Sequence, residues 1–554
     1  MNEACPAGEH DLRGVVYRRS MNPVLAVLLL AAAQADGQIA EAPAPTPATT
    51  QPQPQPEAAT TLPEATAPQQ AKPAAPRQQL RILAQDSRLE AYQQFRTLYE
   101  QARFDEALPL AKRVVELSEA SGERDHELPI AFNNLGATQY QLADYAAAEG
   151  SYRTSLELLE STQGISSRRL VVPLAGLGAV YAAQDKHEVA AELFDRALAV
   201  SRRADGLFNL QQLPLLEQAA DSRYAISDFG GAEREHLYTL KIAEQNYGYG
   251  DARTLPALLD LGAFYESLRE FIAARNMYMR ARDVALKPGV YDPQAVKALV
   301  GIARTHRLQY TMDPDTLDSQ QPARDEVTGE MIGKVYKESR VPPPAADRTG
   351  LKAAQNALEL LRSTSNPPPN LMTETLIELG DWFQATSRPT IAIPYYEEAA
   401  AILDAQVAAD PLAGHPLKAP RMVFYRPPLS ASRGLNTLSG QYIIRKTVFS
   451  FLVSETGLPL DIAVVSTNMD EGQLSQSRRA VSRAIYSPRF AEGRPVSTAG
   501  VTFTGEWYQE YDPESAPPDT TPISTTPAET PPEPEPEPAT PPPTQPGTTL
   551  PSGS

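Results

Sequence analysis

Small residues and rings recur along the middle of the chain with a period close to 42 residues. A loop glycine marks each period, and a small residue follows fourteen positions later. A ring stands sixteen positions after that small residue in four consecutive periods. The glycines are Gly122, Gly164, Gly206, Gly248 and Gly289, the small residues are Gly136, Gly178, Ala220, Gly262 and Ala303, and the rings are Tyr152, Phe194, His236 and Tyr278.

This pattern predicts antiparallel helix pairs that stack into a solenoid. Small residues let two helices approach closely, and a bulky ring fills the gap against the next pair. One pair cannot cover its own apolar face, so several pairs must stack. We expect six to seven pairs over residues 85–406, starting with a weaker unit from about Leu89 to Ala120. An insertion is expected at about 311–346, where the register breaks.

From Tyr442 the apolar period changes from helical to alternating, which is typical of strands. Gly457 can supply the positive φ of a tight hairpin turn. The expected elements are strands over 448–453 and 458–465, a helix over 473–485 and a strand over 501–507. The predicted fold is therefore mainly α, an α-solenoid followed by a small α+β domain of order β-β-α-β over residues 418–510.

The repeat resembles the tetratricopeptide repeat, with the long period seen in kinesin light chains. Leu261-Gly262-Ala263-Phe264-Tyr265, followed by Phe271, Ala274 and Tyr278, fits the family pattern. The resemblance implies a concave groove, lined by the first helix of each pair, that binds protein or peptide ligands. Its acidic members suggest a basic or polar peptide, whereas an ordinary solvated face is the alternative. The expected groove residues are Asn133, Tyr140, Glu217, Asp221, Tyr224 and Glu266.

The C-terminal segment resembles the C-terminal domain of TonB, an energy transducer of Gram-negative envelopes. The matching segments are Tyr425-Arg426-Pro427, Val448 to Ser466, Tyr486 to Phe490 and Gly493 to Val496. The resemblance implies a partner strand added along residues 500–508, with Thr502, Thr504 and Glu506 facing outward. Two departures stand out: Arg426 splits the family's Tyr-Pro pair, and residues 24–35 lack the histidine of the family's membrane anchor.

The N-terminus has the pattern of an export signal over residues 1–35. Arg18 and Arg19 precede an apolar run, and the run is shorter than the roughly 20 residues that cross a bilayer. Cleavage is expected after Ala35, which predicts a periplasmic protein; an uncleaved inner-membrane anchor is the alternative. Residues 36–84 read as a disordered Pro-rich linker, and residues 511–554, with 15 prolines and seven acidic residues, as a disordered tail.

Charge separates the chain into two parts. The net charge of −18 argues against nucleic-acid binding, because phosphate backbones require a basic face. Residues 418–510 hold 11 Lys or Arg against seven Asp or Glu, a balance of +4. Arg479 and Arg483 are expected together on the outer face of the predicted helix. They are either solvated helix charges or contacts to an acidic partner or an anionic cell-wall polymer.

No catalytic motif, phosphate loop or metal-ligand spacing is recognisable, so we expect a non-enzymatic protein without cofactor. The preferred interpretation is an envelope adaptor, whose repeats bind one protein while the C-terminal domain contacts an outer-membrane or other envelope partner. One alternative is a TonB-type energy transducer with an uncleaved anchor. Another is a structural adaptor that holds the cell wall.

Overall fold

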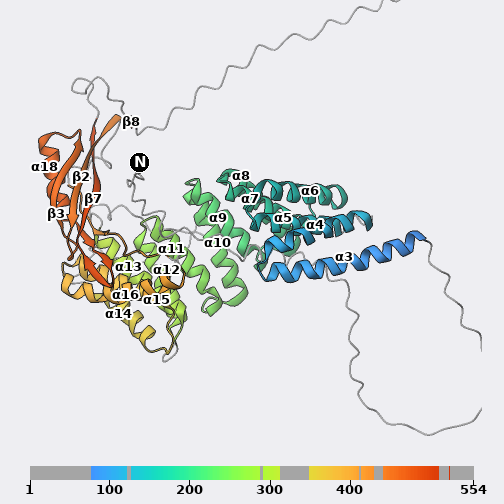
Figure 1. Cartoon of the computed structure of the whole chain (residues 1–554), viewed down its shortest axis with the longest axis horizontal. Coiled ribbons are helices and arrows are strands. Elements are labelled where there is room, and N and C mark those ends of the chain that lie inside the picture. Colours follow the sequence, from blue (N-terminus) through green and yellow to red (C-terminus); the bar gives the residue numbers. More distant parts are fainter. Residues whose placement is uncertain are drawn as a thin grey trace, which may run out of the picture. The chain divides into compact units, whose positions relative to one another are not determined.

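The computed structural model describes residues 76–121, 127–286, 291–311, 348–410, 414–428, 441–510 and 523–524. The chain divides into a unit of residues 10–382 and a second unit formed chiefly by residues 383–554 (Figure 1). The expected signal over 1–35, nearly all of the insertion and most of the acidic tail lie outside the described residues. Helix α3 begins at Pro76, so residues 76–84 are helical and do not belong to the linker expected over 36–84.

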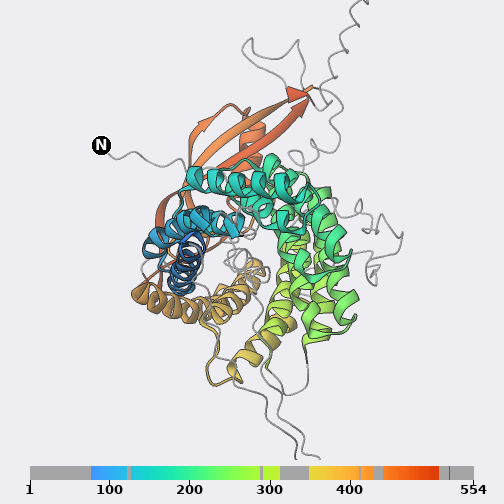
Figure 2. The same ribbon diagram turned by 90° about the vertical axis from the view of Figure 1, so that its right-hand side faces the viewer.

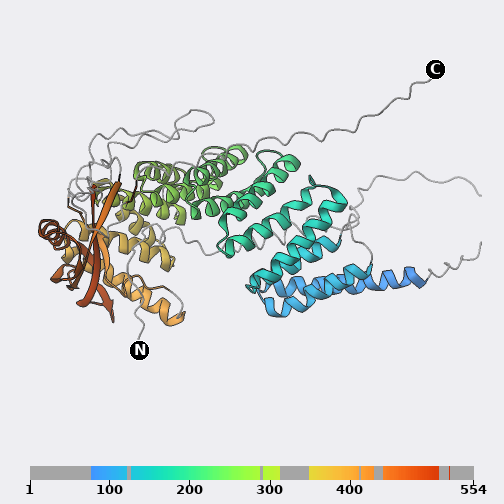
Figure 3. The ribbon, with the colours of Figure 1, turned by 90° about the horizontal axis from the view of Figure 1, so that it is seen from above.

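The first unit is an array of helix pairs, which can be followed by colour from blue through green to yellow in Figure 2 and Figure 3. Helices α3 to α14 form six pairs in the described residues, and α15 and α16 carry the sequence pattern of a seventh. The bounds are α3 (Pro76–Glu100), α4 (Phe104–Ser121), α5 (Glu127–Gln141), α6 (Tyr145–Gln163), α7 (Val171–Ala183), α8 (His187–Asp205), α9 (Leu213–Ala225), α10 (Phe229–Tyr247), α11 (Leu255–Ser267), α12 (Phe271–Ala285), α13 (Pro293–Thr311), α14 (Arg348–Arg362), α15 (Pro369–Ala385) and α16 (Pro389–Ala409).

Two kinds of turn repeat along the array, and only one of them contains glycine. Gly164, Gly206 and Gly248 end the second helix of a pair with φ of 81°, 92° and 95°, as a C-terminal glycine does. A short 3₁₀ turn then leads into the next pair, at η1 (Arg168–Leu170), η2 (Leu210–Gln212) and η3 (Ala252–Thr254). The turns inside the pairs use left-handed residues that are not glycine, namely Ala102, Ala143, Asp185, Ser227 and Arg269.

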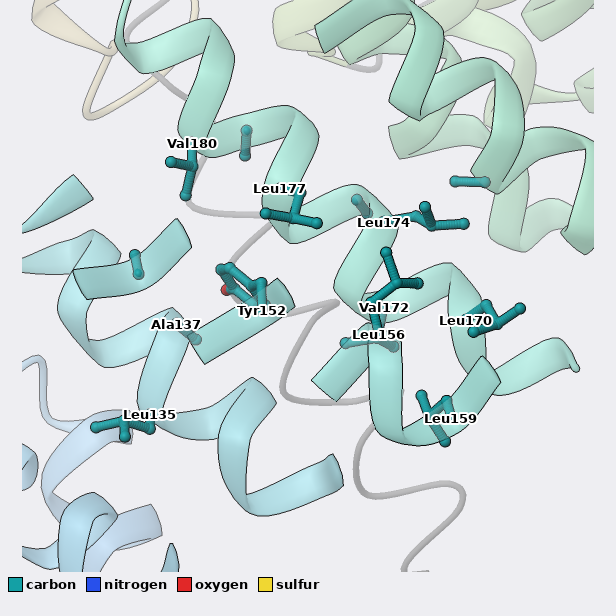
Figure 4. Close-up of a cluster of buried hydrophobic side chains, with 14 of the residues drawn as sticks. Leu135, Ala137, Tyr152, Leu156, Leu159, Leu170, Val172, Leu174, Leu177 and Val180 are labelled. Carbon is teal, nitrogen blue, oxygen red and sulfur yellow. The ribbon is translucent and has the colours of Figure 1, made fainter. Parts of the chain in front are cut away.

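The core of the array contains the predicted rings, and Figure 4 shows one of them, Tyr152, among buried aliphatic side chains. Tyr152 is fully buried between α5 and α7, where Gly136 and Gly176 leave room for its ring. Phe194 lies against Gly178, and Tyr278 lies between Gly262 and Gly301. These contacts confirm the 42-residue register for Tyr152, Phe194 and Tyr278, because each of these rings contacts the small residue of its own pair.

The second unit contains a three-stranded antiparallel sheet of order β3-β2-β7, formed by β2 (Gln441–Val453), β3 (Pro459–Thr467) and β7 (Thr498–Glu510). Helix α18 (Glu471–Val481) covers one face through Val481, and Phe449 and Phe451 form the core beneath it. The remaining strands are β1 (Arg421–Phe424) with β4 (Ile485–Ser487), β5 (Arg489–Ala491) with β6 (Arg494–Val496), and β8 (Ile523–Ser524) on β2.

The predicted order β-β-α-β is present, but the expected helix over 473–485 is wrong at both ends. It starts at Glu471 because Asp470 forms a capping box with Gln473, and it stops at Val481. Ile485 belongs to β4 and not to a helix face. The short strand pairs β1–β4 and β5–β6 were not expected, since three or four residues show no period.

Candidate protein-binding sites

Helix α9 presents three of the predicted groove residues on one face. Glu217, Asp221 and Tyr224 are four and three positions apart, and all three side chains are partly exposed. The ring of Tyr224 lies 5.4 Å from that of Phe229, measured between centroids, in an edge contact that fixes its orientation. Helix α9 therefore offers two carboxylates beside an aromatic ring, a combination suited to a basic or polar peptide.

Tyr140 on α5 is also partly exposed, but it contributes mostly to packing. Its ring lies 5.7 Å from that of Tyr145, and burial raises the pKa of the Tyr140 hydroxyl well above its usual value. Tyr140 therefore contributes to the packing of the array more than to an exposed binding surface.

The structure does not support Asn133 and Glu266 as open groove residues. Asn133 is 6% exposed, and its Oδ1 has no hydrogen-bond partner among the described residues. Glu266 is 4% exposed because its carboxylate accepts hydrogen bonds from Arg304 and, at 2.9 Å, from the Tyr278 hydroxyl. Sequence spacing placed them on the correct helices, but it could not show that their side chains are buried.

A buried ion-pair cluster joins α13 to α15, and the sequence analysis missed it. Arg307 donates to both carboxylate oxygens of Glu378 at 2.7 Å and lies 3.4 Å from Asp381. Burial raises the pKa of Glu378, although the neighbouring Arg307 opposes this rise. Arg304 reaches Glu374 at 2.9 Å. The spacing of Glu374, Glu378 and Asp381 along one helix face is the sequence signal that could have revealed the cluster.

The cluster connects helices that precede the expected insertion in the sequence with a helix that follows it. Glu266 is on α11, Arg304 and Arg307 are on α13, and the remaining carboxylates are on α15. Paired and hydrogen-bonded charges of this kind are costly to break, because one partner would be left buried and uncompensated. We conclude that this cluster is structural and that it holds the register of the array where the 42-residue repeat is interrupted.

In the second unit, β3 pairs with β2 through two register shifts, whereas β7 pairs with β2 through a single shift near its start, between Phe451 and Val453. The pairing of β3 with β2 shifts twice, and Asp461 adopts a left-handed φ of 53° at one shift. The pairing of β7 with β2 runs from Tyr442↔Glu510 to Phe451↔Val501 without a shift. A bulged edge resists strand addition, whereas a regular one can accept it. Strand β7 is therefore the better candidate edge.

Two hydrogen bonds show which residues of β2 direct their backbone N–H and C=O groups toward β3. The N–H of Ser454 donates to the carbonyl of Leu458, and the N–H of Asn468 donates to the carbonyl of Lys446. Backbone direction alternates along an antiparallel strand. The even-numbered residues of β2 therefore face β3, and the odd-numbered ones face β7.

This alternation fixes which backbone groups of β7 are directed away from β2. Phe449 pairs with Phe503, so Phe503 exchanges hydrogen bonds with β2. Its neighbours Thr502 and Thr504, and likewise Glu506, direct their N–H and C=O groups to the outer edge. The side chains of all three are exposed, as the sequence analysis expected.

Glu506 takes part in a cross-strand ion pair at this edge. Its carboxylate lies 2.9 Å from the Lys446 amine and accepts a hydrogen bond from the Tyr508 hydroxyl at 3.0 Å. Partial burial would raise the pKa of Glu506, but the hydrogen bonds from Lys446 and Tyr508 lower it below its usual value. Glu506 is therefore already engaged, and Thr502 and Thr504 are the more available side chains.

The two predicted arginines lie beside the end of α18. Arg479 is exposed in the last turn of the helix, and Arg483 is exposed in the turn that follows Val481. The expectation that both are helix residues is therefore wrong for Arg483. Arg478, which the sequence analysis did not single out, is exposed beside them.

Within the described ranges, no three His, Cys, Asp or Glu side chains gather closely enough to hold a metal ion. None of the helices placed by the structure is both long and apolar enough to pass through a membrane.

Comparison with known proteins identifies the repeat. Residues 96–161 match the family model of the tetratricopeptide repeat. No curated protein matches the chain in sequence. Among solved structures, the C-terminal part of a TPR repeat-containing protein from Cytophaga hutchinsonii is 15% identical, with a TM-score of 0.35, covering 58% of this chain and 96% of that one.

Two other structures are similar at the same level. The apo quorum sensor NprR from B. thuringiensis is 14% identical, with a TM-score of 0.35, over 59% of this chain and 80% of its own. Nearly identical TPR-like repeats assigned to a kinesin light chain of Podosopora anserina are 13% identical, with a TM-score of 0.33, over 35% and 92%. Because these scores are low, the assignment rests on the family match and on the contacts between rings and small residues. The helical part of this chain is a solenoid of helix pairs, and residues 96–161 within it match the tetratricopeptide repeat.

Proposed function

We propose that this chain is a non-enzymatic adaptor of the cell envelope with two separate protein-binding surfaces. The repeat array binds a protein or peptide through its first helices, and α9 is the best candidate contact. The C-terminal domain binds an extended segment of a second, envelope or outer-membrane partner. The observation that carries the second part is the regular outer edge of β7.

The repeat array is consistent with protein–protein interaction. Helix α9 carries Glu217, Asp221 and Tyr224 on one face, all partly exposed, and the edge contact with Phe229 fixes the orientation of the Tyr224 ring. A rigid aromatic ring beside carboxylates can hold a basic side chain by charge and by contact with the ring face. We infer that a basic or polar peptide is the ligand of this surface.

The C-terminal domain supports strand addition through its order β-β-α-β and its sheet order β3-β2-β7. A TonB-like identity would explain why a partner adds to the last strand. The outward backbone of Thr502 and Thr504 supplies donors and acceptors in the spacing that a partner strand needs. A membrane-anchored transducer is the runner-up, but no described residue favours it.

The test uses a photo-crosslinking residue introduced in place of Thr502 in cells that produce the full chain. A partner that adds to β7 should crosslink at this position but not from Ser475, which is exposed on α18. Thr504→Pro should remove one outward donor and abolish the crosslink while the domain stays folded. Thr504→Ala keeps the N–H group and should retain the crosslink.

Two outcomes would overturn this proposal. One is an undiminished crosslink in a folded Thr504→Pro chain. The other is unfolding of the Thr504→Pro domain, seen by circular dichroism, which would mean that the Thr504 N–H points into the sheet.

We also propose that the chain is exported to the periplasm. The arginines Arg18 and Arg19 before a short apolar run support this location. N-terminal sequencing of the mature protein should find Asp36 as its first residue. An intact leader in an inner-membrane fraction would instead favour the anchored transducer.

A further inference from the structure

Three arginines gather at the C-terminal end of α18 without a counter-charge. Arg478 and Arg479 occupy its last turn, and Arg483 follows in the next turn. All three side chains are exposed, and no ion pair or side-chain hydrogen bond to another described residue involves them. The partial negative charge of a helix C-terminus favours a cation there. Three like charges within six residues nevertheless repel one another, which points to an anionic ligand.

Strand β8, the described element that precedes the Glu-Pro run, lies on the β3 side of β2. Tyr442 of β2 pairs with Glu510 of β7 on one side and with Ile523 of β8 on the other. Strand β8 therefore extends β2 on the side occupied by β3. Helix α18 begins soon after β3 ends at Thr467. Ser524, the last described residue, thus lies on the side of β2 on which β3 leads into α18.

The charge and length of this segment fit the arginines. Residues 511–554 carry seven acidic residues and no Lys or Arg, and Glu533, Glu535 and Glu537 alternate with prolines. A Pro-rich backbone advances about 3.1 Å per residue, so these glutamates can reach roughly 28–40 Å from Ser524. An 11-residue helix such as α18 is only about 16 Å long.

The acidic run is also closely spaced. Glutamates two residues apart in an extended Pro-rich backbone are separated by about 6 Å along its axis. Arg478 and Arg479 are in the last turn of α18, and Arg483 lies two residues beyond its end at Val481. More than one carboxylate of the run can therefore reach the three arginines.

We propose that the segment Glu529–Glu537 docks on Arg478, Arg479 and Arg483 and occupies a surface that would otherwise bind an acidic partner. A tether of this length holds the carboxylates at an effective concentration in the millimolar range, so weak individual contacts suffice. An acidic partner has to displace the segment before it reaches α18. High salt releases the segment, because exposed charge pairs are screened.

The direct test uses zero-length carbodiimide crosslinking of the full chain with Arg479→Lys. The substituted side chain should crosslink to Glu533, Glu535 or Glu537, and the yield should not change on dilution. Replacing the three glutamates with glutamine should remove the product. The native pair of Lys446 and Glu506, 2.9 Å apart, provides the positive control.

The matched control is Arg494→Lys, because Arg494 in β6 is exposed and has no ion pair with any described residue. It should give no product with the acidic segment. Equal crosslinking at both positions would mean that the segment samples the surface without docking. Absence of the product from Arg479→Lys would also overturn the proposal.

A second measurement uses a fluorescent hexaglutamate peptide as a probe for the arginines. A full chain whose Glu529, Glu533, Glu535 and Glu537 are changed to Gln should bind the probe about five- to tenfold more tightly than the native chain. Substituting the three arginines with glutamine should abolish binding in both. Equal affinity of the native and neutralised chains for the probe would show that the acidic segment does not cover the arginines. No binding of the probe to either chain would show that the arginines are ordinary solvated charges. Either result overturns the proposal.

Discussion

At the scale of single residues, the array depends on glycines that leave no room for a side chain. A Cβ added at Gly262 would lie 2.7 Å from Cε1 of Tyr278, and one at Gly301 would lie 2.6 Å from Cε2 of the same ring. The Tyr278 hydroxyl is held by Glu266 at 2.9 Å. Because the ring is enclosed on both faces and fixed at its tip, it cannot move aside.

Gly262→Ala should therefore destabilise the array by about 1–3 kcal/mol, as overpacking of a full core does. The matched control is Gly150→Ala, since a Cβ at Gly150 in the middle of α6 meets nothing within 4 Å. That substitution should stabilise the chain by about 0.5–1 kcal/mol, because alanine is the better helix former. Urea unfolding followed by circular dichroism measures both, and equal effects would contradict the assigned register.

Tyr425 makes the C-terminal domain sensitive to alkali. Burial raises the pKa of Tyr425 from 10 to about 12. The folded state therefore holds the proton more tightly than the unfolded state, so stability falls as pH rises from 10 to 12 and is unaffected below pH 10. Each pKa unit corresponds to about 1.4 kcal/mol, which makes the full loss about 1–3 kcal/mol.

Tyr425→Phe should reduce this alkaline loss while keeping the ring contact with Phe503, 4.7 Å away between centroids. Urea midpoints at pH 8 and pH 11 measure the effect through Trp507, in a chain whose other tryptophan, Trp382, is replaced by Phe. Tyr486 keeps some of the slope, since burial raises its pKa as well. An unchanged slope in Tyr425→Phe would show that this hydroxyl does not titrate in the folded domain.

At the scale of elements, features that recur in every helix pair could be predicted from the sequence, whereas features found at a single position could not. Ring and small-residue positions were predictable because they recur in every pair. The left-handed turn at Ser227 was not predictable, because serine has no preference for the positive φ that this turn requires. Burial of Glu266 was hidden for a different reason: its partner Arg304 lies 38 residues away on another helix.

The domain boundary also differs from the sequence expectation. The amide of Gln384, near the end of α15, donates to the carbonyls of Thr456 at 2.6 Å and Tyr486 at 2.8 Å. The ring of Tyr396 on α16 lies 6.0 Å from that of Phe490, between centroids. Both helix residues belong to the same unit as the sheet. The C-terminal domain therefore needs α16, which the sequence assigned to the repeats.

A fragment of residues 418–524 should consequently be less stable than a fragment of residues 369–524. Without α16, Phe490 loses its cover, and exposing one such ring costs about 1.5–3 kcal/mol. Urea unfolding of the two fragments, followed by the fluorescence of Trp507 with Trp382 of the longer fragment replaced by Phe, measures the difference. Coincident midpoints would restore the boundary between 406 and 418 that the sequence suggested.

At the scale of the whole array, one contact between second helices changes its chemistry from pair to pair. Positions 36 residues apart meet at each junction of α6, α8, α10 and α12. They are Glu160 with Arg196, Arg202 with Tyr238, and Glu244 with Arg280. The first and third are ion pairs, and in the second the guanidinium lies 4.7 Å from the ring centroid. The repeats are thus equivalent in shape but not in the partner that each accepts.

Deleting residues 206–247 removes one whole period and joins Asp205 to Gly248. A solenoid with contacts only between neighbours should remain folded, with its helical content per residue unchanged.

The deletion would, however, bring Arg202 beside Arg280, which places two like charges where the full-length chain has an attractive pair. Arg202→Glu should therefore stabilise the shortened chain by about 0.2–1 kcal/mol, because it recreates the ion pair found at the next junction. In the full-length chain the same substitution should destabilise by a similar amount, since it removes the contact of Arg202 with the Tyr238 ring. Thermal melts of the full-length and shortened chains, each with and without Arg202→Glu, measure these effects. If the substitution changes stability in the same direction in both chains, the contact between second helices does not determine which repeats can be neighbours.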